Sequence, residues 1–178
     1  MLQSFLFEIN DHRRKQGMRY QQGPILLFSI LAILSGATSY RKIHQFIVNH
    51  YDELDEVFEL NWKRMPAYTT IRDIIQGTAR EELEQSFRKH SNSLVNRDKK
   101  RLFVGYDGKV LRGSFDDFND QKAIQILSAF ANDENIILAH EEVEDKTNEI
   151  PTAQYLIEKL GLTGCVFTFD ALHCQRNA

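Results

Sequence analysis

The stretch Leu102-Phe103-Val104-Gly105-Tyr106-Asp107 decides the fold of this chain, because it is a short apolar run that closes on an acid. A second run of the same kind, Cys165-Val166-Phe167-Thr168-Phe169, is followed by Asp170. Short apolar runs rich in Val and aromatic side chains predict buried strands. An acid at the end of each of two strands is a common way to present carboxylates to divalent ions. Asp107 and Asp170 are therefore the candidate metal ligands.

The sequence between these two runs predicts how they meet. Residues 123–131 and 136–143 are two more apolar runs, and Asn132-Asp133-Glu134-Asn135 between them predicts a hairpin turn. A helix that opens at Pro151 then leads to the last strand. If the last strand lies parallel beside the first, a right-handed crossover joins them, and strands about 4.8 Å apart let both acids share one ion. This order, a three-stranded meander, a helix and a fourth strand, is the first half of an RNase H-like fold.

The first half of the chain has helical periodicity instead. Gly23-Pro24 predicts the start of a central helix over Ile25–Leu34, and Gly36 its end. Three more helices are expected: one over Tyr40–Asn49 with Thr38 or Ser39 as the cap, one that starts at Pro66 and Thr69-Thr70, and one over Arg80–Lys89. A polar connection between the first two of these helices contains Asp52, Glu53, Asp55 and Glu56.

Charge divides the chain in the same place. Its 178 residues carry a formal net charge of −3, but residues 1–100 hold 15 Lys and Arg against 12 Asp and Glu, and residues 101–178 hold 7 against 13. A basic half followed by an acidic half fits a DNA-contacting module before a carboxylate-bearing one, or uneven surface charge without function. We expect an α+β protein with an all-helical domain at 1–90, a linker at 91–101 and a partial catalytic core at 102–178.

Cysteine content and hydropathy predict a cytoplasmic protein. Cys165 and Cys174 match neither a zinc site nor a disulfide framework, which favours a reducing compartment. The apolar run Ile25–Leu34 follows four basic residues, but ten residues cannot span a bilayer, which needs about 20. No membrane partner is expected.

Three linked motifs resemble one family. Tyr106–Ser114, which reads YDGKVLRGS, is similar to the D-G-K-x-L-R-G-S element of insertion-sequence transposases of the ISAs type, also known as H-repeat-associated proteins. The segment KTNEIP at 146–151 resembles their K-[ST]-N-E-I-P element, and TFDALHCQ at 168–175 their T-x-D-A-L-H-x-Q element. In the first half, PAYTTIR at 66–72 resembles their P-S-x-x-T-[FL]-x-R segment, with Ala67 in place of the common Ser.

The resemblance implies DDE chemistry. Two aspartates and a glutamate bind Mg²⁺ or Mn²⁺, and the ions assist attack on a phosphodiester. Asp107 would be the first acid and Asp170 the second. The implied partners are the DNA of insertion-element ends and target DNA, together with a homo-oligomer or a full-length transposase. Because the family glutamate follows the second aspartate and the sequence given ends eight residues after Asp170, we expect a truncated, catalytically incomplete copy.

The resemblance also suggests residues around the two acids. Lys109 and Arg112 are candidates for contacting DNA phosphates, or they neutralise Asp107 and Asp116/Asp117. Asn148, Glu149 and His173 are candidate supporting residues; Glu149 fits a helix start, where the dipole favours a carboxylate, and His173 equally fits packing or capping.

Thr69, Thr70 and Arg72 are candidate DNA contacts in the helical half. They head a helix that follows a turn and an earlier helix, which is compatible with a helix-turn-helix. The same order is common in bundles that do not bind DNA. Two alternatives to an active transposase stay open: a non-catalytic DNA-binding or dimerising fragment that modulates the full-length enzyme, and, less favoured by the linked motifs, another RNase H-like nuclease.

Overall fold

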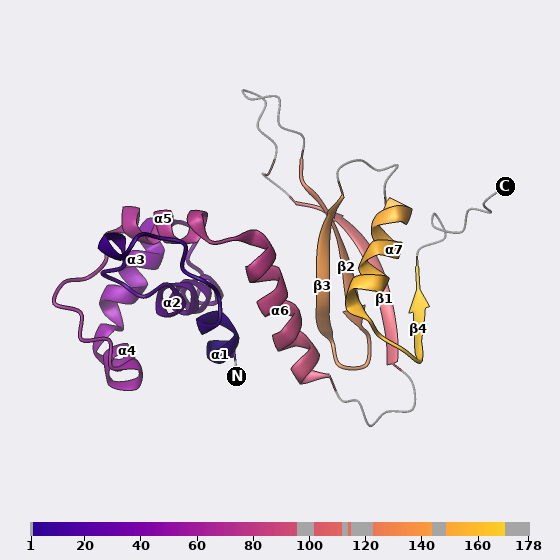
Figure 1. Ribbon diagram of the computed structural model, residues 1–178, viewed down its shortest axis with the longest axis horizontal. Helices are drawn as coiled ribbons and strands as arrows, with labels where there is room; N and C mark the ends of the chain where they lie inside the picture. Colours follow the sequence, from indigo (N-terminus) through magenta and orange to yellow (C-terminus); the bar gives the residue numbers. More distant parts are fainter. Residues whose placement is uncertain (1, 96–101, 112–113, 115–122, 144–148, 170–178) are drawn as a thin grey trace. The chain divides into compact units, whose positions relative to one another are not determined.

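The computed structural model describes residues 2–95, 102–111, 114, 123–143 and 149–169. Within these ranges the chain is α+β, with helices first and a mixed four-stranded sheet second, as the sequence predicts. It divides into two compact units, Met1–Ser86 and Phe87–Ala178 (Figure 1). Each unit has its own hydrophobic core.

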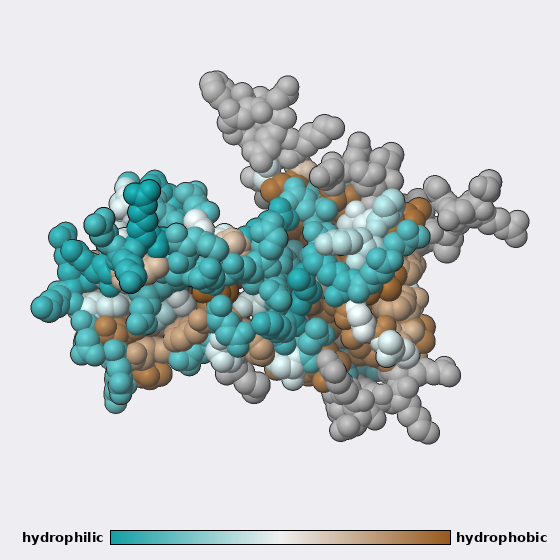
Figure 2. Space-filling model, in the orientation of Figure 1, coloured by the Kyte–Doolittle hydropathy of each residue, from teal (hydrophilic) through white to brown (hydrophobic). Residues whose placement is uncertain are grey.

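The first unit is built around α2 (Gln22–Leu34), which starts three residues earlier than predicted. Ile25, Phe28 and Ala32 are fully buried in it, so it is the central helix that its apolar sequence indicates. The other elements of the unit are α1 (Leu2–Phe7), the 3₁₀ turn η1 (Lys15–Gly17), α3 (Tyr40–Asn49), α4 (Tyr51–Phe58), α5 (Tyr68–Gly77) and the start of α6 (Arg80–Leu94). Hydrophilic residues cover most of the visible face of this unit (Figure 2).

Three of the helical predictions need correction. The segment predicted as a polar connection is α4, because Leu54 and Phe58 lie one turn apart on its inner side while Asp52, Glu53 and Glu56 are exposed. The short helix α1 was not expected, yet Leu6 is buried in the core. The helix α6 continues beyond Lys89 to Leu94, so the first four residues of the expected linker 91–101 are helical; residues 96–101 lie outside the described residues.

The second unit contains a sheet with strand order β3-β2-β1-β4. Its strands are β1 (Leu102–Val110), β2 (Gln125–Ala131), β3 (Ile136–Val143) and β4 (Cys165–Thr168). The strand β2 is antiparallel to both β1 and β3, and β4 is parallel to β1. The helix α7 (Glu149–Leu160) joins β3 to β4 and packs on β3 and β2 through Ala153, Leu156 and Leu160 (Figure 1).

The strand β1 is longer than predicted. It runs to Val110, and Asp107 pairs with Ser128 of β2, so this acid lies inside the strand instead of just after it. Asp and Gly are depleted in strands, which is why the run Asp107-Gly108 reads as a strand end. Pairing with β2 overrides that local preference. The helix α7 begins at Glu149, and Pro151 sits in its first turn, where a missing N–H costs little.

The start of α3 yields a first prediction. The Ser39 side chain accepts a hydrogen bond of 3.3 Å from the Lys42 N–H, so Ser39 is the cap that the sequence left open between Thr38 and Ser39. We expect Ser39→Ala to lower the free energy of unfolding by about 1 kcal/mol, as loss of an N-cap usually does. Urea unfolding of the two alanine variants measures it, with Thr38→Ala as the control. Equal losses for both would contradict the assignment.

Candidate functional site

The candidate site lies at one end of the β1–β4 pair. The two strands are parallel, with Phe103 opposite Val166 and Gly105 opposite Thr168. Asp107 lies two residues after Gly105 in the chain, and Asp170 lies two residues after Thr168. Asp170 is outside the described residues. Asp107 thus comes two residues after the last paired position of the described parallel ladder.

Asp107 projects from the face of the sheet opposite α7. Tyr106 is buried on the α7 side, where its ring lies 6.0 Å from the Phe167 ring and 4.7 Å from the Phe169 ring. Successive residues of a strand point to opposite faces. Asp107 therefore shares its face with Gly105 and Lys109, and the Asp107 and Lys109 side chains are both exposed.

The surroundings of Gly105 on this face are polar. A Cβ atom at position 105 would lie 3.1 Å from Asn132 Oδ1 and 3.5 Å from Thr168 Oγ1. An amide oxygen and a hydroxyl therefore lie over Gly105, next to Asp107 on the same strand. Hard oxygen donors of this kind suit Mg²⁺ and Mn²⁺. Among the residues that the structure describes, no group of three or more His, Cys, Asp or Glu could hold a metal ion.

Glu149 belongs to the other face. It is the first residue of α7, as its predicted place at a helix start requires, and its carboxylate Oε1 contacts the position that a Cβ of Gly108 would occupy. Gly108 shares the α7 face with Tyr106. A strand backbone therefore separates the Glu149 carboxylate from the Asp107 face. The assignment of Glu149 as a supporting residue stays a prediction.

Tyr106 carries an unusual hydroxyl. The side chain is 6% exposed, and its oxygen has no hydrogen-bond partner within the described residues. Burial raises the pKa of Tyr106 from 10.0 to about 12, with a smaller contribution from Cys165. The buried ring continues the apolar core directly behind Asp107.

The helix α5 departs from the helix-turn-helix prediction. Nine residues separate α4 from α5, whereas that motif uses a turn of three or four, and α5 packs on α3 and α2. Thr69 and Thr70 are half-buried, and Arg72 pairs with Asp73 at 2.8 Å. Their proposed DNA contacts remain predictions. Arg112, Asn148 and His173 lie outside the described residues.

Sequence reasoning missed a cavity in the helical unit. It has a volume of about 690 Å³ and is lined by the segment around Arg19 and by the connection that follows α4, which includes Lys63 and Arg64. The adjacent basic residues Lys63 and Arg64 could have indicated this site, but nothing in the sequence shows that they lie near Arg19. No helix within the described parts of the chain is long and apolar enough to cross a membrane.

Comparison with known proteins agrees with the two units. A family model described as DDE_Tnp_1-associated matches residues 3–91, which is half of the chain. The chain is 27% identical to "H repeat-associated putative transposase YhhI" of Escherichia coli K12, over 95% of this chain and 44% of that protein. It is also 27% identical to "H repeat-associated putative transposase YbfD" of the same strain, over 95% of this chain and 66% of that protein.

The relatives of this chain are thus named as putative transposases. The "Putative transposase YncI" of Escherichia coli O157:H7 is 26% identical over 99% of this chain and 45% of its own length. The chain spans about half the length of several curated relatives that it matches. No solved structure was found to match it. The chain belongs to the H-repeat-associated family of insertion-sequence transposases, with a DDE_Tnp_1-associated domain at its start.

The buried hydroxyl yields a second prediction. Because the pKa of folded Tyr106 is raised, the unfolded chain loses this proton first as the pH rises; the stability it contributes is present below pH 10 and is lost as the pH passes through about 12. We expect the free energy of unfolding of Tyr106→Phe to fall less steeply between these pH values than that of the wild type. At pH 7 the variant should be as stable or up to about 1 kcal/mol more stable, since it buries no unpartnered hydroxyl.

Denaturant unfolding at pH 7, 10 and 11 measures both effects. Tyr155→Phe is the matched control, because Tyr155 is 51% exposed on α7 in the same unit. Parallel pH profiles for the wild type and Tyr106→Phe would show that Tyr106 does not set the alkaline response.

Proposed function

We propose that this chain supplies the helical domain and the first part of an RNase H-like catalytic core of a DDE transposase, which cuts and joins the DNA of an insertion sequence. The observation that carries the proposal is the parallel pairing of β1 with β4, in which Gly105 lies opposite Thr168. This register, continued by two residues on each strand, leads to Asp107 and Asp170. The strand order β3-β2-β1-β4, with a helix between β3 and β4, supports the RNase H-like assignment.

We assign the metal site to Asp107 and Asp170, with Mg²⁺ or Mn²⁺ as the ion. The polar atoms of Asn132 and Thr168 over Gly105 fit a site for a hard cation better than an apolar contact. Bound divalent ions would supply Lewis acidity for the attack of water or a 3′-hydroxyl on a phosphodiester. Within the described residues, Asp107 has no ion pair that would occupy its carboxylate.

The protein side chains around this site have separate tasks. Asp107 holds negative charge at a fixed place because β1 is paired on both sides. Lys109 lies two residues further on the same face, within the reach expected for a DNA phosphate near the metal. Arg112 is assigned the same role from the sequence alone. Tyr106 closes the apolar layer behind the acid and keeps water out of the strand pair.

The third acid of the triad is not assigned to Glu149. Strand alternation supports this, since Glu149 lies over Gly108 on the α7 face and Asp107 projects from the other one. Residues 171–178 contain no Asp or Glu. We therefore expect these 178 residues by themselves to bind metal without cleaving DNA.

A metal-binding experiment tests this proposal. Mn²⁺ titration of the 178-residue chain, followed by electron paramagnetic resonance, should show a bound ion, and both Asp107→Asn and Asp170→Asn should weaken its binding at least ten-fold because each removes a carboxylate ligand. Glu149→Gln and Glu158→Gln are the controls; Glu158 is an exposed acid on the same helix as Glu149. Unchanged binding in Asp107→Asn, or a loss in Glu149→Gln equal to it, would refute the assignment.

A second function is favoured by one observation. The family model covers residues 3–91, which form a helical unit with its own buried core. Such a unit could bind element ends or a full-length transposase without catalysis. Neither function expects cleavage by the 178-residue chain, so Mn²⁺ binding separates them: a bound ion that is lost in Asp107→Asn would exclude a purely non-catalytic role.

A further inference from the structure

We infer that the cavity of the helical unit is a phosphate-binding site that holds the sugar-phosphate backbone of DNA, in a different unit from the candidate carboxylate site. The inference rests on the proposed function, since it assumes a chain that acts on DNA. It assigns the helical unit's DNA contact to Arg19, Lys63 and Arg64 instead of to the start of α5.

Charge and size are the first argument. The cavity has a volume of about 690 Å³, and its rim contains the side chains of Arg19, Lys63 and Arg64 against one carboxylate, Glu59. All three cations are exposed. None of them has an ion pair to a carboxylate within the part of the chain that the structure describes. Three cations without ion pairs around one hollow form an arrangement that can bind phosphate groups.

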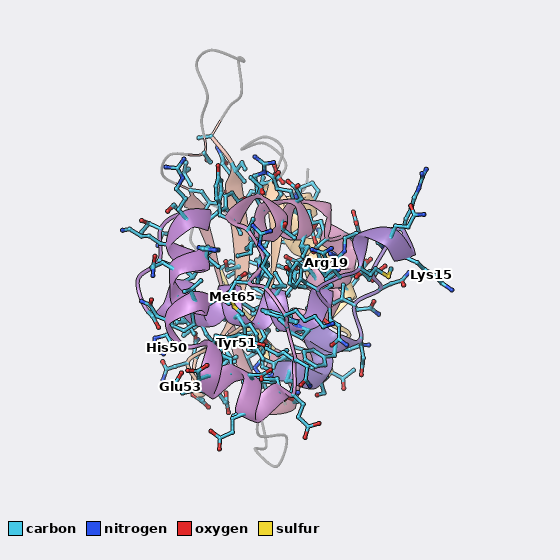
Figure 3. The ribbon with its side chains drawn as sticks, turned by 90° about the vertical axis from the view of Figure 1, so that its left-hand side faces the viewer. Lys15, Arg19, His50, Tyr51, Glu53 and Met65 are labelled. Carbon is cyan, nitrogen blue, oxygen red and sulfur yellow. The ribbon has the colours of Figure 1, made fainter. Side chains whose placement is uncertain are left out.

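A neighbouring arginine has a structural role instead. Arg13 lies a few residues before Arg19, but its guanidinium pairs with Asp11 at 2.6 Å and donates to the Tyr20 carbonyl at 2.7 Å. This pairing lowers the pKa of Asp11, chiefly through the hydrogen bond from Arg13. Arg13 thus fixes the segment that presents Arg19, while Arg19 remains available for a ligand. Figure 3 labels Arg19 and Tyr51 in the view that turns the left-hand side of Figure 1 toward the reader.

The opposite wall of the cavity is held equally firmly. The Tyr20 hydroxyl donates to the Arg64 carbonyl at 2.9 Å and so joins the two walls. The Trp62 N–H donates to the Tyr51 hydroxyl at 2.8 Å, and the Asn61 N–H to an Asp55 carboxylate oxygen at 2.7 Å. A connection that is fixed before binding presents its cations at a low cost in conformational entropy.

The connection also adopts a costly backbone. Glu59 and Asn61 both have positive φ, 49° and 52°, in the left-handed region that residues other than glycine seldom occupy. The strain is retained because Tyr51, Asp55 and Tyr20 hold the connection on both sides. It places Lys63 and Arg64 beside Arg19, from a position more than forty residues away in the sequence.

The ring packing explains why the cavity binds a backbone and not a stacked base. Trp62 is half-buried and lines the cavity, and its ring is held in place by the rings of Tyr20 at 5.2 Å, Phe28 at 6.1 Å and Tyr51 at 5.9 Å. The charged groups of the lining are the three cations of the rim, Arg19, Lys63 and Arg64, and the Glu59 carboxylate, and the cations are the groups suited to phosphates. These bind phosphates without reading sequence.

Charge reversal tests the inference in the full 178-residue chain. A fluorescence anisotropy titration with labelled duplex DNA compares the wild type with Arg19→Glu/Lys63→Glu/Arg64→Glu. We expect at least a ten-fold loss of affinity at 0.1 M salt, and a slope of log K against log salt that is smaller by about 2 to 3, as about three phosphate contacts require. All three side chains are exposed, so the fold should persist, and a thermal melt within 3 °C of the wild type verifies it.

A matched variant reverses three other exposed cations of the same unit. Arg41→Glu/Lys42→Glu/Arg72→Glu changes the net charge equally and covers α3 and the start of α5. It should lose less than three-fold. A larger loss in this variant than in the cavity variant would move the contact to α5 and overturn the inference.

The remaining arms separate the source of the phosphate and the two proposals. Inorganic pyrophosphate at 1 mM should displace little DNA. If it binds the cavity more tightly than DNA does, the ligand is a small phosphate compound, and the assignment to a DNA strand is wrong. DNA binding that survives the cavity variant overturns this inference while Mn²⁺ binding at Asp107 can still succeed. If the wild type binds no Mn²⁺ but its DNA binding depends on the cavity residues, the metal-site proposal is wrong and this inference stands.

Discussion

The parallel hydrogen bonding between β1 and β4 is the constraint on which the candidate site depends. A parallel pair needs a long crossover, and here α7 supplies it. The strand β4 has only four residues and forms one edge of the described sheet, so its own ladder cannot hold it. The packing of α7 on β2 and β3 does so, and burial of a leucine such as Leu156 contributes about 2 kcal/mol.

The two faces of β1 have different environments. Val104 and Tyr106 bury into the α7 layer, while Asp107 and Lys109 remain exposed on the other face. Apolar packing on one face therefore fixes the position of a carboxylate on the other. This is why Glu149, which belongs to the KTNEIP segment, lies over Gly108 without joining Asp107.

The sequence predicted those parts of the fold that depend on local pattern. The hairpin of β2 and β3, the existence of β4 and the central helix α2 follow from apolar runs and turn residues, whereas the parallel pairing of β4 with β1 was left open. It failed where tertiary contacts override local preference. The end of β1 is one case, since Asp107 and Gly108 are strand residues only because β2 pairs with them. The helix α4 is another, because its acids hide the stripe of Leu54 and Phe58.

Sequence motifs give candidate residues for the site but not their arrangement. Asp107 and Asp170 stay candidates, and only the strand register shows on which face of the sheet Asp107 lies. The cavity had no comparable motif, since a single hydrogen bond from Tyr20 to Arg64 joins segments that no sequence spacing relates.

Physical chemistry gives a reason for dividing the two sites between the two units. Carboxylates that attract divalent ions also repel DNA phosphates, so a cationic site in the other unit adds DNA affinity beyond what Lys109 beside Asp107 can supply. Residues 1–100 have a net charge of +3, and residues 101–178 have −6. If phosphate binding resides at Arg19, Lys63 and Arg64, the helical unit supplies affinity for DNA without neutralising Asp107. The acidic half can then keep its carboxylates for metal ions, with DNA held by the basic half.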